Sequence, residues 1–479
     1  MRLGHELKRL GRHSAIYGLG GLVSRILATL LLPLYTHFLS PRAYGRVEIV
    51  TAATAVLAIA LQLGISSAFF RFYFDARTDP ERLTVIRTSF WFTMGMATLG
   101  LVVGFVLATP ISHVLRFGDD PWLVRAGFVG LWAQMNYQQL TALFRVEERP
   151  GAFVAATIAN VFITVGSTIL LVVTFHKGAT GAVVGNFIGT LAVYFVLLGY
   201  RRYQLGFQFD RKLLRAMNKF GMPLVPAALA LWAINFIDRF FVAIFKGQAE
   251  VGVYSLAVRV ASVIVFLMAA FQLAWPAFAY SIEEEHIAKR TYAFVLTYLM
   301  LLCSWASLVL GLLSPWIVRI LAPRNEAFWR ASEAVGILCF SATAYAGYTV
   351  LAIGIGRARR TQFNWIVTGG AALLNVALNF ALIPPYGMMG AAIATLAAYV
   401  AMFVGMSLNA QRVWPVPYQW RRVLTLSLVA AALLAIGKAV SAPLPLAIAL
   451  CLVYPVVLLP FRFYLPAELR RLRVRRMAA

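Results

Sequence analysis

The sequence predicts an all-α polytopic membrane protein with 14 transmembrane helices, arranged as two pseudo-repeated six-helix bundles followed by two C-terminal helices. Three observations lead to this fold class. The 479 residues are 61% hydrophobic and 13% charged, with a mean hydropathy of +0.78, which lies outside the range of soluble globular proteins. The apolar residues gather in segments long enough to cross a bilayer. The first and second parts of the chain also share short motifs at a nearly constant offset.

Fourteen segments meet the length of about 20 mostly apolar residues that a spanning helix needs. They lie near residues 14–37, 46–70, 88–109, 122–143, 152–175, 180–200, 220–245, 252–275, 294–318, 332–355, 362–384, 388–410, 423–441 and 444–463. The N-terminus is basic, as in a signal peptide, but its apolar run is long and no small-residue cleavage site follows it. We therefore expect the first segment to be a retained helix.

The net charge of +25 is distributed unevenly along the chain. Thirty of the 43 Lys and Arg residues lie at the N-terminus or in, or within four residues of, the even-numbered gaps between spans, and ten lie in, or within four residues of, the odd-numbered gaps. The other three, Arg25, Arg239 and Arg259, lie deeper within spans. Because cytoplasmic loops are enriched in Lys and Arg, both termini are expected in the cytoplasm. We expect the loop charges to contact membrane lipids and water, and we expect no nucleic-acid partner.

Residues typical of catalytic or metal centres are scattered. Cys303, Cys339 and Cys451 fall in apolar segments without a pairing spacing, so neither a disulfide nor a metal cluster is expected. No histidine stands at a catalytic spacing from a carboxylate. The longest polar gaps, 201–219 and 276–293, are too short for a separate domain. We therefore expect no enzyme, no cofactor and no metal.

An internal repeat divides the chain. Three pairs of segments align at offsets of 207 to 210 residues: Phe38 to Gly45 with Phe245 to Gly252, Gln62-Leu63 with Gln272-Leu273, and Gly178-x-x-Gly181-Ala182 with Gly387-x-x-Gly390-Ala391. Four parts follow: an N-terminal six-helix bundle (1–200), a cytoplasmic linker (201–219), a C-terminal six-helix bundle (220–410), and helices 13 and 14 with a basic cytoplasmic tail (411–479). Because six is even, the repeats are parallel, and transporters of this kind bind substrate between the halves.

Motifs in both halves resemble one family. In the first half they are Ser24-Arg25-Ile26-Leu27, Leu32-Pro33-Leu34-Tyr35, Leu39-Ser40-Pro41, Tyr44-Gly45, Leu63-Gly64-Ile65-Ser66 and Phe70-Arg71-Phe72. In the second half they are Phe220-Gly221-x-Pro223-Leu224-x-Pro226, Asn235-Phe236-x-Asp238-Arg239-Phe240 and Val251-Gly252-Val253-Tyr254-Ser255-Leu256. Together they resemble the bacterial Wzx-type flippases of polysaccharide and O-antigen repeat units. The likeness covers nearly the whole chain.

This resemblance implies the fold of the multidrug/oligosaccharidyl-lipid/polysaccharide (MOP) exporter superfamily, which includes the MATE exporters. The implied cargo is an oligosaccharide on undecaprenyl diphosphate, carried across the bacterial inner membrane by alternating access for surface polysaccharide such as lipopolysaccharide or capsule. A polysaccharide polymerase and a chain-length regulator are further partners to consider. Related lipid II flippases have an arginine-lined cavity and two extra C-terminal helices that hold the lipid tail, so helices 13 and 14 here are expected to do the same.

Arg25 is the principal candidate for substrate binding. A charge near the middle of a bilayer helix normally faces protein or water, and the arginine fork binds phosphate in a bidentate way. Arg25 shares a face of its helix with Tyr17, Gly21 and Ser24, which indicates a cavity lining. A structural salt bridge with Glu48 is the alternative. Glu48 itself is either a proton-coupled carboxylate or the partner of an arginine.

Two further arginines are candidates for the anionic head group. Arg259 lies early in the eighth span, with Ser255 and Ser262 on its face. It either binds the diphosphate or extends to the lipid headgroups. Arg71 begins the loop after the second span, where it either receives the incoming phosphate or is an ordinary loop charge.

Uncharged polar residues complete the candidate site. Gln62 and Gln272 occupy matching places in the halves, where they either hydrogen-bond sugar hydroxyls or join helices. Asn235, Asp238 and Arg239 share the seventh span. The adjacent Asp238 and Arg239 are expected to neutralise each other in a structural role, with contact to an ion or sugar as the second interpretation.

Two other functions stay open at this point. A cation-coupled multidrug exporter shares the fold, but such proteins generally have twelve helices and an acidic residue in an early helix. An intramembrane polysaccharide polymerase or ligase usually carries a long periplasmic loop, whereas the odd-numbered gaps here are short. Both differences favour the flippase.

Overall fold

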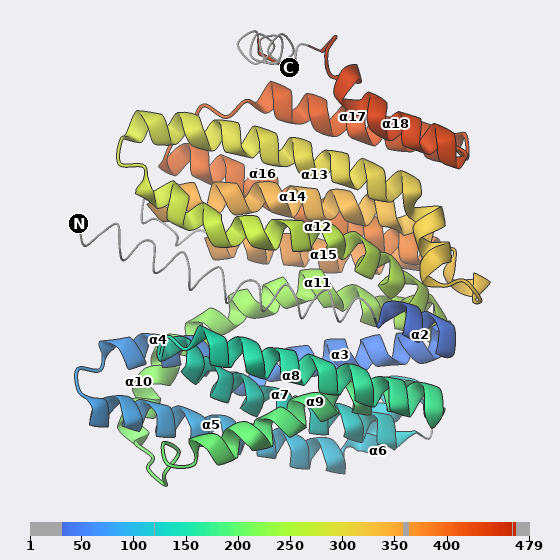
Figure 1. Cartoon of the computed structure of the whole chain (residues 1–479). Helices are drawn as coiled ribbons and strands as arrows, with labels where there is room; N and C mark the ends of the chain where they lie inside the picture. Colours follow the sequence, from blue (N-terminus) through green and yellow to red (C-terminus); the bar gives the residue numbers. More distant parts are fainter. Residues whose placement is uncertain (1–30, 119, 358–363, 462, 466–479) are drawn as a thin grey trace. The chain divides into compact units, whose positions relative to one another are not determined.

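The computed structural model describes residues 31–118, 120–357, 364–461 and 463–465. Throughout these ranges the ordered elements are helices (Figure 1). Contacts between Cα atoms divide the chain into two compact units. The first comprises Met1–Ser255, Leu321–Phe328 and Asn375–Ala391, and the second comprises Leu256–Ile320, Trp329–Leu374 and Ala392–Ala479.

The first unit is built mainly from the helices of the N-terminal part of the chain. In chain order these are α2 (Leu32–Phe38), α3 (Pro41–Gln62), α4 (Ile65–Asp75), α5 (Asp79–Val106), α6 (Ala108–Val114), α7 (Pro121–Val146), α8 (Pro150–Ile169), the π-helical turn η1 (Leu170–Thr174), α9 (Gly178–Arg201), α10 (Arg211–Gly221), the 3₁₀ turn η2 (Met222–Leu224) and α11 (Val225–Phe245). Helices α5, α7 and α9 run alongside one another (Figure 1).

The second unit contains most of the remaining helices. They are α12 (Gln248–Ser281), α13 (Glu285–Leu321), α14 (Ala331–Arg357), α15 (Asn364–Tyr386), α16 (Met388–Val413), α17 (Trp420–Ala439) and α18 (Leu444–Val457), with the 3₁₀ turn η3 (Glu326–Phe328) before α14. Helix α12 begins in the first unit and continues into the second at Leu256.

Helix starts follow local capping rules. Ser40 accepts a hydrogen bond from the Ala43 N–H at the start of α3, and Pro41 occupies the first turn, where its missing N–H costs nothing. Thr78 and Glu81 form a capping box at the start of α5. Asp210 accepts hydrogen bonds from the first amides of α10. These caps fix where each helix leaves its loop.

The expected second span, residues 46–70, is interrupted. Helix α3 ends at Gln62, Leu63 and Gly64 adopt left-handed φ angles of 48° and 75°, and α4 follows as a separate helix. A Cβ on Gly64 would lie 2.2 Å from the carbonyl oxygen of Gly221. Only glycine fits this turn comfortably, because it tolerates both the positive φ and the close backbone.

Eleven helices in the described ranges are long and apolar enough to cross a membrane. They correspond to eleven of the expected segments. Helix α7, with 26 residues, and α18, with 14, correspond to the fourth and fourteenth. The first expected segment lies for the most part outside the described residues. The all-helical multi-pass fold is therefore confirmed, and the count of 14 stays a prediction.

Candidate functional site

A buried ion cluster joins α3 to α11. The Arg239 guanidinium lies 3.5 Å from a carboxylate oxygen of Glu48 and 3.2 Å from one of Asp238. The exposed fractions of Glu48, Asp238 and Arg239 are only 3%, 2% and 4%. Charges at such depth are costly unless they are paired and hydrogen-bonded. The close pairing of these three groups is what makes their burial possible.

Hydrogen bonds hold the cluster in place. The Tyr254 hydroxyl at the start of α12 donates to the second oxygen of Asp238, and the Arg239 backbone N–H donates to the first at 2.8 Å. Arg239 Nη1 donates to the backbone carbonyl of Asn235 at 2.7 Å, one helical turn earlier. Because residues three and four apart share a helix face, the Asn-x-x-Asp-Arg spacing places all three on the same side of α11.

Aromatic side chains of α11 lie next to the ion cluster. The Arg239 guanidinium lies 4.9 Å from the centroid of the Phe236 ring. One turn before that ring, Trp232 donates its indole N–H to the carbonyl oxygen of Ala52 on α3 at 3.1 Å. Helices α3 and α11 are thus joined by an ion pair and by a separate hydrogen bond. Both helices lie in the first compact unit, although the division predicted from the sequence assigns α3 to the first half and α11 to the second.

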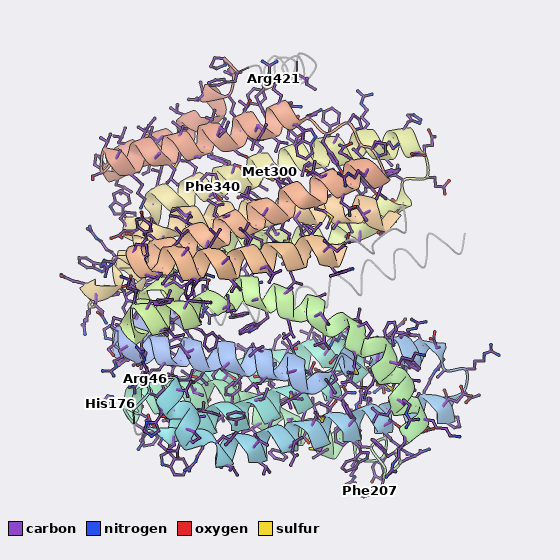
Figure 2. All side chains as sticks on the ribbon, turned by 180° about the vertical axis from the view of Figure 1, so that it is seen from behind. Arg46, His176, Phe207, Met300, Phe340 and Arg421 are labelled. Carbon is purple, nitrogen blue, oxygen red and sulfur yellow. The ribbon has the colours of Figure 1, made fainter. Side chains whose placement is uncertain are left out.

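Gln248 forms a second polar connection at the end of the first unit where α3 begins. Its side-chain oxygen accepts hydrogen bonds from the Nε atoms of Arg46 at 2.9 Å and Arg42 at 3.3 Å. Its amide nitrogen donates to the carbonyls of Arg116 at 2.7 Å and Leu115 at 3.1 Å. Figure 2 shows Arg46 at the opposite end of this unit from Phe207, which lies in the expected cytoplasmic linker.

Residues near Leu321 also meet the first repeat at this end. The Thr36 hydroxyl donates to the Leu321 carbonyl, and the Asn325 side chain donates to the Leu39 carbonyl at 3.5 Å. Together with Gln248, they join α2, α3 and the loop after α6 to the second repeat. We call these contacts the α2/α3 lock. The charge distribution predicts that it faces the periplasm.

The predicted site residues are only partly brought together. Glu48, Asp238, Arg239 and the backbone of Asn235 form one cluster. The Asn235 side chain itself donates to the Leu231 carbonyl at 2.7 Å. Arg25 lies outside the described residues, so its proposed pairing with Glu48 stays a prediction; the described partner of Glu48 is Arg239.

The other two arginines lie elsewhere. Arg259 is half-buried on the part of α12 that belongs to the second unit, and its carbonyl accepts from the Ser262 hydroxyl at 2.6 Å. Arg71 is exposed, lies 3.5 Å from the Asp75 carboxylate, and stacks over Phe220 at 4.5 Å. Arg71 thus lies within helix α4 and not in a loop as predicted, and it is already engaged by Asp75 of the same helix and by Phe220 of α10.

The two glutamines have local partners. The Gln62 amide lies 3.3 Å from the side-chain oxygen of Gln138, and its own oxygen accepts from Ser66 at 3.0 Å. Gln272 hydrogen-bonds Tyr345 within the second unit. Both glutamines join helices in this structure, and their contact with sugar stays a prediction.

Sequence reasoning missed Gln248. It lies in the segment Phe245 to Gly252, which aligns with Phe38 to Gly45 in the internal repeat. A long polar side chain that is 7% exposed in such a segment is a detectable signal. Its four partners, however, come from α3 and the loop after α6, which no local pattern relates to it.

Known structures share this fold over nearly its whole length. A lipid II flippase MurJ in an inward closed conformation aligns with a TM-score of 0.73 at 12% identity, covering 92% of this chain and 98% of that one. An inward-facing multidrug resistance MATE transporter of the MOP superfamily aligns with a TM-score of 0.68 at 15% identity, covering 81% and 94%. An outward-facing MATE transporter gives 0.61 at 13%, covering 85% and 98%. The chain therefore has the fold of these flippase and transporter structures.

The family follows from the sequence. A family model described as polysaccharide biosynthesis protein matches residues 10–281, more than half of the chain, and the MatE model matches residues 223–381. The chain belongs to the polysaccharide biosynthesis protein family. No curated protein matches it in sequence.

Proposed function

We propose that this protein is a flippase that moves undecaprenyl-diphosphate-linked oligosaccharide repeat units across the bacterial inner membrane. The cargo serves the synthesis of surface polysaccharide such as O-antigen, capsule or exopolysaccharide. Membership of the polysaccharide biosynthesis family supports this assignment. The highest TM-score reported above is that of a lipid II flippase.

Chain coverage is the observation that favours a lipid flippase over a drug exporter. The lipid II flippase covers 92% of this chain, whereas the two MATE structures cover 81% and 85% although they are themselves aligned over 94% and 98%. This chain therefore contains a larger part that a MATE architecture does not account for. The two helices α17 and α18, which follow the predicted repeat, account for this additional part. We assign to them the binding of the lipid tail.

The docking of α17 within the second unit suits that role. The Lys438 ammonium donates to the Ser314 hydroxyl at 3.1 Å and to the Ser332 carbonyl at 2.9 Å. Leu434 lies over Gly311 and Gly336, where added Cβ atoms would approach it to 2.8 and 2.7 Å. Trp305 on α13 donates to the Cys451 carbonyl on α18 at 2.9 Å. The two helices are thus packed closely against this unit.

In the proposed cycle, Arg25 and Arg259 bind the diphosphate and the halves rock to expose it at the other side. Guanidinium groups suit this task because they stay charged in a poorly hydrated site and bind phosphate with two hydrogen bonds. The α2/α3 lock must open for release to the periplasm. The Glu48–Arg239 pair is assigned a structural role as the contact between α3 and α11.

Complementation tests the assignment. A strain that lacks the flippase gene should regain surface polysaccharide with the wild-type gene and fail to do so with Arg25→Ala at equal protein level. Arg25→Lys should restore part of the activity, because it retains the charge and loses the fork. Arg77→Ala, at an exposed position just before α5, is the control. Full activity of Arg25→Ala would remove Arg25 from the mechanism.

A cation-coupled multidrug exporter is the second candidate, because the MatE model matches residues 223–381. Expression in a drug-sensitive strain would then raise resistance to cationic drugs. We expect no change in resistance. The relatives are transporters, so nothing found favours an intramembrane polymerase or ligase.

The proposed pathway includes two protein partners, a polysaccharide polymerase and a chain-length regulator. Both act on the flipped unit at the periplasmic side in this scheme. Co-purification of the tagged flippase with either protein from native membranes would support the partnership. Its absence would leave the flippase assignment unaffected.

A further inference from the structure

An apolar cavity of about 340 Å³ lies on the first unit between α5, α7 and α9. It is far in sequence from the ion cluster and from α17 and α18. Its walls come from three helices, and the lining residues are Phe105, Trp122, Arg125, Ala126, Val129, Thr180, Val184, Phe187, Ile188 and Leu191. A cavity of this kind on a membrane-spanning bundle is accessible to lipid chains.

Arg125 is the single charged residue of this lining. Its guanidinium lies 4.8 Å from the Trp122 ring and 6.0 Å from the Phe105 ring, and its Nε atom is buried. No carboxylate pairs with Arg125, and no group accepts a hydrogen bond from its Nε, within the described ranges. A buried donor without an acceptor is costly. An anion brought by a ligand would remove that cost.

The depth of the cavity suits one membrane leaflet. Along α9 the lining extends from Thr180 to Leu191, twelve residues whose eleven steps of about 1.5 Å give a rise of about 16 Å. This is about half of the hydrocarbon thickness of roughly 30 Å. Trp122, which is 64% exposed, lies beside Arg125 at the start of α7, and such aromatic residues gather at the headgroup level. The charge is thus at the headgroup end of a leaflet-deep apolar wall.

We propose that this cavity binds one acyl chain of an anionic phospholipid, with the lipid phosphate against the Arg125 guanidinium. A zwitterionic lipid would add an ammonium group next to the arginine, whereas an anionic lipid neutralises it. An undecaprenyl chain of eleven isoprene units is much longer than this leaflet-deep wall. The site therefore holds a resident lipid, and the proposal does not depend on the identity of the cargo.

Photo-cross-linking in vesicles tests the site. The purified full-length protein is placed in vesicles that carry phosphatidylglycerol or phosphatidylcholine with a photoreactive acyl chain, and labelled peptides are mapped by mass spectrometry. We expect phosphatidylglycerol to label the α7 and α9 segments of the cavity about tenfold more than phosphatidylcholine, as one charge-assisted hydrogen bond would give. Arg125→Gln should abolish this preference. Lys177→Gln, which removes an exposed charge before α9, should retain it.

Variants that fill the cavity with a larger side chain give an independent test of the proposal. Ala126→Trp should abolish labelling of these segments by either lipid, and Ile188→Trp provides the same test from the opposite wall if the first variant does not fold. Val196→Trp, at a 69% exposed position of α9 outside the lining, is the matched control. The proposal would be overturned if the two lipids label these segments equally and Arg125→Gln does not change the labelling. Displacement of phosphatidylglycerol by undecaprenyl phosphate would also overturn it, because the site would then belong to the cargo.

Discussion

Gly45 of α3 and Gly252 of α12 pack backbone against backbone. A Cβ on Gly45 would lie 1.9 Å from the Gln248 carbonyl oxygen, and a Cβ on Gly252 would lie 2.0 Å from the Pro41 carbonyl oxygen. The two glycines are also equivalent positions of the internal repeat, at an offset of 207 residues. In the division predicted from the sequence, the two halves thus contact each other through the same residue of each repeat, beside the α2/α3 lock.

Substitution of either glycine should disturb the lock. Gly45→Ala or Gly252→Ala places a methyl group against rigid backbone, which typically costs about 1–3 kcal/mol. We expect a lower melting temperature and reduced surface polysaccharide in the complementation assay. Gly95→Ala on α5 is the control, because nothing lies within 4 Å of its Cβ position. If all three variants give the same melting temperature and the same amount of surface polysaccharide, the close contact between the glycines is not needed for function.

The ion cluster predicts an asymmetry between its members. Arg239→Gln leaves Glu48 and Asp238 buried without the guanidinium, a loss of about 3–5 kcal/mol in unfolding free energy. Glu48→Gln leaves Arg239 still paired with Asp238, so its cost should be smaller. The double variant should be more stable than Arg239→Gln alone. Thermal melting in one detergent measures all three, and equal melting temperatures for the single variants would contradict the pairing.

Gln248 should control access at the α3 end of the unit. Gln248→Ala removes the side-chain group that four partners share, and each lost hydrogen bond to a charged group weakens the lock by about 1.5–3 kcal/mol. Ser255, fully buried two turns later on α12, reports on opening when replaced by cysteine. Labelling of Ser255→Cys by an impermeant maleimide from the periplasm should increase in the Gln248→Ala background. The native cysteines are buried and give a low background; unchanged labelling would mean that Gln248 does not restrain this end.

Lys438 provides a test of the assigned role of α17. Lys438→Met removes both hydrogen bonds of the ammonium group to the second unit and should loosen the end of α17. We expect undecaprenyl-linked repeat units to accumulate in cells, because the tail is held less well. Lys212→Met, on the exposed face of α10, should have no such effect. If the repeat units accumulate in neither variant, α17 has no role in transport.

The hydrophobic pattern was sufficient to predict the membrane helices, because burial in lipid requires long apolar segments irrespective of tertiary contacts. The break at Leu63 and Gly64 was not predicted, although Leu63-Gly64-Ile65-Ser66 had been noted as a motif. A glycine within an apolar run does not itself reveal a positive φ. The turn depends on Gly221, which lies more than 150 residues later in the chain.

The sequence predicted which residues belong to the candidate site better than it predicted which of them contact one another. Glu48, Asp238 and Arg239 were identified as intramembrane charges, and an arginine partner for Glu48 was one of the two interpretations. The identity of that partner required the packing of α3 on α11, since Arg239 already had an adjacent carboxylate in Asp238. The Gln248 contacts depend on three separate segments, which a one-dimensional pattern does not relate.

Translocation by the purified protein is the most direct test of the central claim. Vesicles containing the protein would be loaded with an undecaprenyl-diphosphate oligosaccharide in the inner leaflet, and an impermeant glycosidase would be added outside. The account predicts that the glycan becomes cleavable over time with the wild-type protein and stays protected with Arg25→Ala. A glycan that stays protected in wild-type vesicles, under conditions in which the same vesicles export a cationic drug, would contradict the account.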